Sequence, residues 1–133
     1  MRLWSYQLLP YLPKSQLLAQ WRELNSIFKK QDKHILINYI YNYPKEYLWI
    51  YTVAVVDEMD NRHIKIGKWD NYENYFKDIT SAPENLRFAE HDDEYLKICY
   101  YNLKEKYLRG QKDFTRDVWE KLDEFYKKEM RNE

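Results

Sequence analysis

The carboxylate of Glu23 lies at a position where a side chain could do chemistry. At about 100° per residue it falls about 240° from Leu17 on a predicted helix, away from the apolar side of that helix. The apolar side consists of Leu17, Trp21, Leu24 and Phe28. Ala19 and Ser26 lie on the same polar side as Glu23. Because both are small, another chain segment or a ligand could reach the carboxylate. The carboxylate could then transfer protons or stabilise a developing positive charge. The alternative is an exposed glutamate beside Arg22 on a surface helix.

The other reactive side chains do not combine into a recognisable site. His34, His63 and His91 lie far apart in the sequence, without the spacing of metal ligands. The lone Cys99 rules out a disulfide framework and a Cys-rich zinc site, and it occupies a core-like position of a predicted helix. Two glycines are too few for a dinucleotide-binding loop or a phosphate-cradling Gly-Lys-Ser loop. We therefore expect neither a metal ion nor an organic cofactor.

The composition is that of a folded protein with balanced charge. Aromatic residues make up 18% of the 133 positions, and 22 Lys and Arg are matched by 22 Asp and Glu. So many aromatic side chains exclude a disordered chain. No apolar run approaches the roughly 20 residues that span a bilayer, and no signal peptide opens the sequence, which predicts a cytoplasmic protein without a membrane partner. Generic nucleic-acid binders are basic, so a nucleic-acid role for this neutral chain would require a local basic face.

Four segments are expected to form the helices that position these residues, and they cover approximately residues 13–30, 44–61, 92–109 and 113–130. Apolar residues recur at helical spacing in each segment, and Asp92 and Gly110 are typical of the start and end of the third. Residues 37–43 are interpreted as an extended loop or an irregular helix. The pattern predicts an all-α fold in which residues 1–133 form one compact helical bundle.

Several short motifs of the first sixty residues resemble one known family. The chain opens with Met1-Arg-Leu-Trp, continues with Leu17-Leu-Ala-Gln-Trp-Arg-Glu-Leu, and then has Lys33-His-x-x-x-Asn-Tyr and Asp57-Glu-Met. In order and spacing these motifs resemble the pyrimidine-dimer DNA glycosylase/AP lyase family of the phage endonuclease V type, in particular its cellular Met-Arg-Leu-Trp branch. The resemblance implies a helical domain with the N-terminal segment packed between the helices.

The resemblance also implies an unusual nucleophile, the α-amine of Met1, with Glu23 as the essential carboxylate. Methionine aminopeptidases need a small second residue, so Arg2 should leave Met1 in place. An α-amine has a pKa of about 7.7–8.0, against about 10.4 for lysine, and is therefore partly neutral and nucleophilic near pH 7 without any special environment. Such an amine can attack the sugar C1′, displace the base and form a Schiff base, while the carboxylate moves protons during β-elimination.

The same resemblance implies double-stranded DNA as the partner of a monomeric enzyme. The predicted DNA-binding residues are Arg2, Arg22, Lys29, Lys30, Lys33, His34, Asn38 and Tyr39. Cations would offset part of the cost of bending DNA or flipping a nucleotide. For the basic cluster that follows the first helix, a second interpretation is that it complements the helix dipole.

One departure from the family pattern concerns the substrate. Ser26 stands where the phage-type enzymes have a further arginine, so the substrate could be a pyrimidine dimer, an abasic site, or another damaged or modified base. The alternative from another functional class is a non-catalytic module that binds nucleic acid or protein on the same helical scaffold. For a DNA enzyme, the cations should gather around Arg2, Arg22 and residues 29–34, and the acids should lie away from that face, at residues 57–60, at residues 90–94 and in the last helix.

Overall fold

The computed structural model describes residues 1–132, and these form helices joined by loops, without a β-strand among them. The α-helices are α1 (Lys14–Lys30), α2 (Lys45–Asn61), α3 (Asp70–Tyr75), α4 (Asp93–Leu108) and α5 (Arg116–Glu129). Short 3-10 helices are η1 (Tyr6–Tyr11), η2 (Asn38–Asn42) and η3 (Met130–Asn132). The all-α prediction is confirmed. None of the helices among the described residues is long and apolar enough to cross a membrane.

The four predicted helices correspond to α1, α2, α4 and α5, and their ends have local physical causes. The Asp92 side chain accepts a hydrogen bond from the Tyr95 amide at 2.9 Å and so caps α4, as its sequence position indicated. Gly110 follows α4 with φ of 78°, a conformation that glycine adopts without strain. Of the two interpretations of residues 37–43, an extended loop or an irregular helix, the structure shows the second, because η2 occupies most of that connector.

The start of the last helix differs from the prediction, and one short helix was not predicted. The last helix starts at Arg116 rather than Asp113, because Asp113 caps a different helix. Its carboxylate accepts hydrogen bonds from the Ser15 amide at 2.8 Å and from the Ser15 hydroxyl at 2.6 Å, in the first turn of α1. The Thr115 hydroxyl then caps α5 by accepting from the Val118 amide. Helix α3 was not predicted at all.

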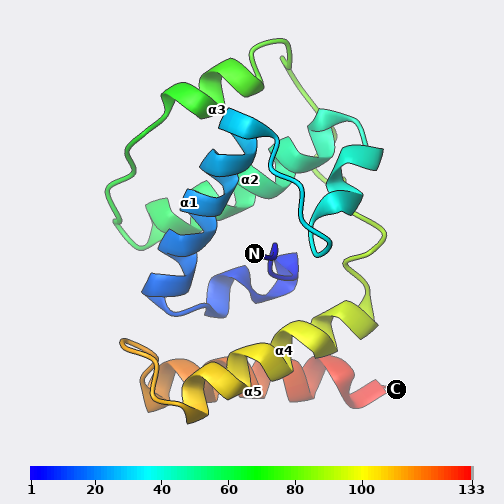
Figure 1. The fold of residues 1–133 in the computed structure, drawn as a ribbon. Helices are drawn as coiled ribbons and strands as arrows, with labels where there is room; N and C mark the ends of the chain where they lie inside the picture. The colour runs from blue at the N-terminus through cyan, green and yellow to red at the C-terminus, as the bar shows by residue number, and fades with distance from the viewer. Residues whose placement is uncertain (133) are drawn as a thin grey trace.

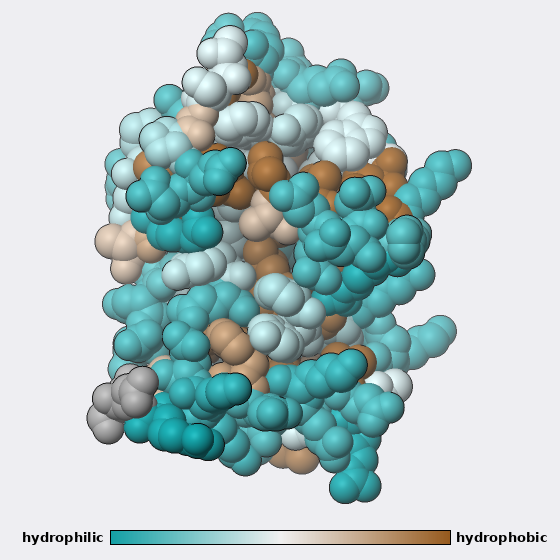
Figure 2. Space-filling model, turned by 180° about the vertical axis from the view of Figure 1, so that it is seen from behind, coloured by the Kyte–Doolittle hydropathy of each residue, from teal (hydrophilic) through white to brown (hydrophobic). Residues whose placement is uncertain are grey.

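The helices form two layers with the N-terminal segment between them (Figure 1). Helix α1 contacts both α2 and α3 on one side, and α4 and α5 run antiparallel on the other. The N-terminal segment and η1 contact both α2 and α5, so the start of the chain is enclosed by the rest of the fold. From behind, the surface is mostly hydrophilic, and apolar side chains show only as narrow bands between charged ones (Figure 2).

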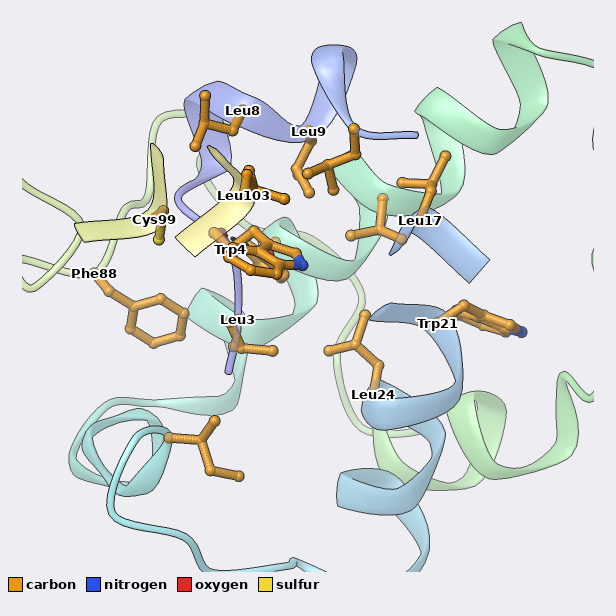
Figure 3. Close-up of a cluster of buried hydrophobic side chains, with 14 of the residues drawn as sticks. Leu3, Trp4, Leu8, Leu9, Leu17, Trp21, Leu24, Phe88, Cys99 and Leu103 are labelled. Atoms are coloured by element: carbon orange, nitrogen blue, oxygen red, sulfur yellow. Dashed lines mark hydrogen bonds between the residues drawn. The ribbon is translucent and has the colours of Figure 1, made fainter. Parts of the chain in front are cut away.

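The first twelve residues contribute heavily to the hydrophobic core. Leu3, Leu8, Leu9 and Leu12 are almost completely buried. Figure 3 shows Leu3 and Trp4 projecting into a cluster that contains Leu24 of α1 and Cys99 and Leu103 of α4. The predicted apolar side of α1 is buried as expected, at Leu17, Trp21, Leu24 and Phe28. Because so many side chains of this segment are buried, the core fixes the position of the segment and of residue 1 at its start.

Candidate active site

The backbone of the N-terminal segment is bound to α1 through the side chain of Gln20, which is only 1% exposed. Its Oε1 accepts a hydrogen bond from the Trp4 amide at 2.9 Å, and its Nε2 donates to the Arg2 carbonyl at 3.2 Å. The Tyr51 hydroxyl from α2 donates to the Trp4 carbonyl at 2.7 Å and lies 3.0 Å from the same Gln20 oxygen. One buried amide therefore holds the first residues of the chain against two helices.

Helix α4 holds the same segment from the other side. The Tyr95 hydroxyl donates to the Leu3 carbonyl, and the Ser5 amide donates to the Cys99 Sγ at 3.4 Å. Burial raises the pKa of the Cys99 thiol, which favours its neutral form and fits a structural position. Since polar backbone groups in a core need partners, these contacts explain how an extended segment can run through the interior.

The chain begins at the edge of a cleft of about 240 Å³. The cleft is lined by Met1, Arg2, Trp4, Gln16, Ala19, Glu23, Leu36, Asn102 and Lys106. These residues come from the N-terminal segment, α1, the loop after α1, and α4. Hollows of about 250 and 480 Å³ lie along α5, so volume does not distinguish the cleft. Its lining distinguishes it, because Met1, which carries the terminal amine, and the half-buried Glu23 both line it.

The carboxyl group of Glu23 is half-buried and electrostatically linked to the N-terminus. Its Oε2 accepts a hydrogen bond from Gln20 Nε2 at 3.0 Å. Burial raises the pKa of Glu23, while the N-terminal amine, Arg22 and Lys106 partly counteract that rise. Among the described residues, no ion pair within 4.0 Å joins the Met1 amine to this carboxylate. The N-terminal amine therefore acts on Glu23 through its charge and not through a direct ion pair.

Of the predicted DNA-binding cations, one lines the cleft and others lie on the exposed surface of α1. Arg2 lines the cleft, with its guanidinium 5.8 Å from the centre of the Tyr95 ring. Arg22 is exposed on α1 next to Glu23. Lys29 and Lys30 are exposed in the last turn of α1, where they also complement the helix dipole.

The remaining predicted residues belong to the loop after α1 and to η2. Lys33 and His34 are exposed in the loop. Asn38 Oδ1 accepts a hydrogen bond from the His34 amide at 2.7 Å, so its side chain shapes the loop. Tyr39 is half-buried, bonds to His91 through its hydroxyl at 2.6 Å, and is not among the residues that line the cleft. Burial raises the pKa of Tyr39 and lowers the pKa of His91 to about 4.

Sequence reasoning located Glu23 and its small neighbour Ala19 but not the rest of the lining. Ser26 was expected beside the carboxylate, yet its hydroxyl donates to the Asp32 carboxylate at the far end of α1. Gln20 was missed, although an amide directly before a buried tryptophan is an unusual residue for the apolar side of a helix. Asn102 and Lys106 come from α4, and no local pattern links them to Glu23.

The described residues contain no group of three or more His, Cys, Asp or Glu side chains that could hold a metal ion. A model of the pyrimidine dimer DNA glycosylase family matches residues 1–71 of the chain. No curated protein and no solved structure matches it. The matched part comprises the N-terminal segment, α1 and α2, and therefore includes Met1, Glu23 and Gln20. The part of the cleft that α4 supplies lies outside it.

Proposed function

The chain belongs to the pyrimidine dimer DNA glycosylase family, and on that premise we propose that it is a DNA N-glycosylase with AP-lyase activity that uses the α-amine of Met1 as its nucleophile. The observation that carries the proposal is that Met1 and Glu23 line one cleft and that the N-terminal amine lowers the pKa of Glu23 against the effect of burial. The nearby cations Arg2 and Lys106 suit a phosphodiester substrate.

The proposed reaction begins when the neutral amine attacks C1′ of the damaged nucleotide. The N–C1′ bond forms, the glycosidic bond breaks, and its electron pair leaves with the base. Opening of the sugar ring gives a Schiff base between the Met1 nitrogen and C1′. Removal of a C2′ proton then expels the 3′ phosphate by β-elimination, and water hydrolyses the imine to release the enzyme.

Glu23 is the residue that serves these steps best. As a carboxylate it stabilises positive charge that develops on the sugar and on the attacking amine. Because burial raises its pKa while nearby cations hold it down, the group can exchange protons more readily near neutral pH than an exposed glutamate does. Gln20, which bonds both the Arg2 carbonyl and Glu23, acts as a positioning residue for the pair.

The proposed substrate is duplex DNA that carries a pyrimidine dimer, an abasic site or another damaged base, bound by a monomer in the cytoplasm. Arg2, Arg22 and the exposed Lys29 and Lys30 would contact phosphates around the cleft. Base identity would be decided by the lining of the cleft, where α4 contributes Asn102 and Lys106.

Borohydride trapping tests the proposal, because reduction of the Schiff base links protein and DNA covalently. Protein with an authentic N-terminus should be trapped on abasic duplex and, if it recognises dimers, on irradiated duplex. One residue added before Met1 should abolish trapping, since the α-amine would then belong to another residue, whereas a tag after residue 133 should leave it intact. If the authentic protein binds abasic duplex but is never trapped, the enzyme hypothesis is wrong and the non-catalytic interaction module replaces it.

A further inference from the structure

The loop between α1 and η2 presents two adjacent aliphatic side chains to solvent. Ile35 is 85% exposed and Leu36 is 38% exposed, whereas the next residue, Ile37, is completely buried. Single apolar side chains on a surface are ordinary, whereas two adjacent branched aliphatic side chains on one turn form a small apolar surface that a partner can cover. Ile35 is also the most exposed of the large hydrophobic residues in the described part of the chain.

Hydrogen bonds within the loop hold this tip in one shape. The His34 carbonyl accepts from the Ile37 amide at 2.8 Å and from the Asn38 amide at 2.9 Å. The Asn38 side chain accepts from the His34 amide, and the Leu36 amide donates to His34 Nδ1 at 3.2 Å. With Ile37 anchored in the core, the tip is a preformed turn and loses little conformational entropy when it inserts into a partner.

The tip lies beside the candidate active site. Leu36 lines the same cleft as Met1 and Glu23, and in Figure 1 the loop (cyan) descends from the end of α1 to the level of the N-terminus. The residues before the tip, Lys33 and His34, are exposed and can meet phosphates. An apolar point that follows an exposed lysine and lies beside the proposed nucleophile suits the base stack of a duplex, which has an apolar interior and an anionic exterior.

We propose that Ile35 and Leu36 form a wedge that enters the base stack beside the lesion and opens it, so that C1′ of the target nucleotide can reach the Met1 amine. This inference rests on the proposed glycosylase and lyase function. A cleft of about 240 Å³ cannot hold an intact duplex, so C1′ can reach Met1 only when the duplex is bent or a nucleotide leaves the stack, and a wedge favours both. An inserted aliphatic side chain fills the space that the displaced nucleotide leaves and keeps it from returning.

The test compares Ile35→Ser with two controls. Ile35→Met keeps an apolar tip, and Leu108→Ser removes an aliphatic side chain that is 70% exposed on α4 but does not line the cleft. Because both altered side chains are mostly exposed, the variants should fold. The first readout is the fluorescence of 2-aminopurine opposite a tetrahydrofuran abasic analogue, which reports unstacking without any reaction. The second is borohydride trapping on abasic duplex and on abasic single-stranded DNA.

We expect wild-type protein, Ile35→Met and Leu108→Ser to raise the 2-aminopurine fluorescence, and Ile35→Ser to lose most of that rise. Ile35→Ser should be trapped about ten- to hundredfold more slowly on duplex, because it loses the burial of one aliphatic side chain. On single strands it should be trapped at the wild-type rate. Normal fluorescence with Ile35→Ser, or equal slowing on both substrates, would overturn the wedge. Unstacking by wild-type protein without trapping on either substrate would retain the wedge and overturn the proposed chemistry.

Discussion

Replacing Gln20 with methionine isolates the contact that joins the N-terminal segment to Glu23. Methionine has a similar length and is apolar, so it fills the same buried space without any hydrogen bond. The Trp4 amide and the Arg2 carbonyl would then lose their partner. The Tyr51 hydroxyl keeps its bond to the Trp4 carbonyl, so α2 still holds the segment at one point.

The cost can be worked out from those two groups. A buried polar group left without a partner costs about 1–3 kcal/mol, and since the Arg2 carbonyl is only partly buried, the total should be about 2–4 kcal/mol. Unfolding entropy of about 2.1 cal/mol/K per residue over 133 residues converts this into a fall in Tm of about 7–14 °C. A shift of the Met1 amine by about 1 Å should slow trapping about 100-fold, even at a temperature where the variant is fully folded.

A loss of stability alone would not identify Gln20 as a positioning residue, so the pH profile of trapping supplies a second measurement. Burial raises the pKa of Glu23, and the hydrogen bond from Gln20 is one of the contacts that hold it down. Without that bond the pKa rises further. If the reaction needs the carboxylate, activity is lost as pH falls through this pKa, so the acidic limb of the Gln20→Met profile should move to higher pH.

Asn25→Leu is the matched control, because it also replaces a buried amide on α1. Its Nδ2 donates to the Trp21 carbonyl one turn earlier, and its Oδ1 has no partner within the described residues. Removing it should cost less than about 1 kcal/mol and leave trapping and its pH profile unchanged. Trapping of Gln20→Met at the wild-type rate with an unmoved acidic limb, or equal impairment of the control, would rule out Gln20 as a positioning residue.

Three further predictions concern single side chains. Glu23→Gln should slow trapping by about 10²–10⁴-fold. It should also raise Tm at neutral pH, because the raised pKa of Glu23 means that the ionised carboxylate destabilises the folded state. This gain in Tm should vanish as pH falls and the wild-type carboxyl protonates. Lys106→Ala should weaken duplex binding and reduce its salt dependence by about one phosphate contact, while Lys121→Ala on α5 should do neither. Burial lowers the pKa of His91 to about 4, so between pH 6.5 and 4 only the unfolded chain takes up a proton at this residue. The free energy of unfolding should therefore fall by about 3 kcal/mol over this range. Urea titrations of wild type and His91→Phe should show a smaller loss in the variant.

The sequence was sufficient for the long helices because their apolar residues recur over four or more turns and their ends have recognisable caps, such as Asp92. It was insufficient for α3, which has six residues and buries none of them, so there is no periodicity to detect. The start of α5 was placed too early because Asp113 looks like a cap in the sequence but caps α1 instead. That contact joins residues 98 positions apart, and only the folded chain reveals it.

The candidate site, like the fold, was predictable from the sequence only in part. The position of Glu23 on a face away from the core follows from helical geometry alone, and the structure places it in the cleft beside Ala19. The other wall, Asn102 and Lys106, comes from a helix some eighty positions later, and it depends on how α4 packs across the N-terminal segment. Local patterns contain no information on that packing.

The neutral net charge of the chain is compatible with a local excess of positive charge in the cleft. Among the lining side chains, Arg2 and Lys106 are cationic and Glu23 is anionic, so the cleft carries an excess of positive charge in a chain whose total is zero, even when the Met1 amine is the neutral nucleophile. The local potential depends on where charges lie and not on their sum. The same cations that would attract phosphate also oppose the effect of burial on the pKa of Glu23, since the amine and Lys106 both lower it. DNA attraction and proton transfer would therefore be coupled, and removing a cation from this cleft would weaken the first while moving the carboxyl further towards its protonated form.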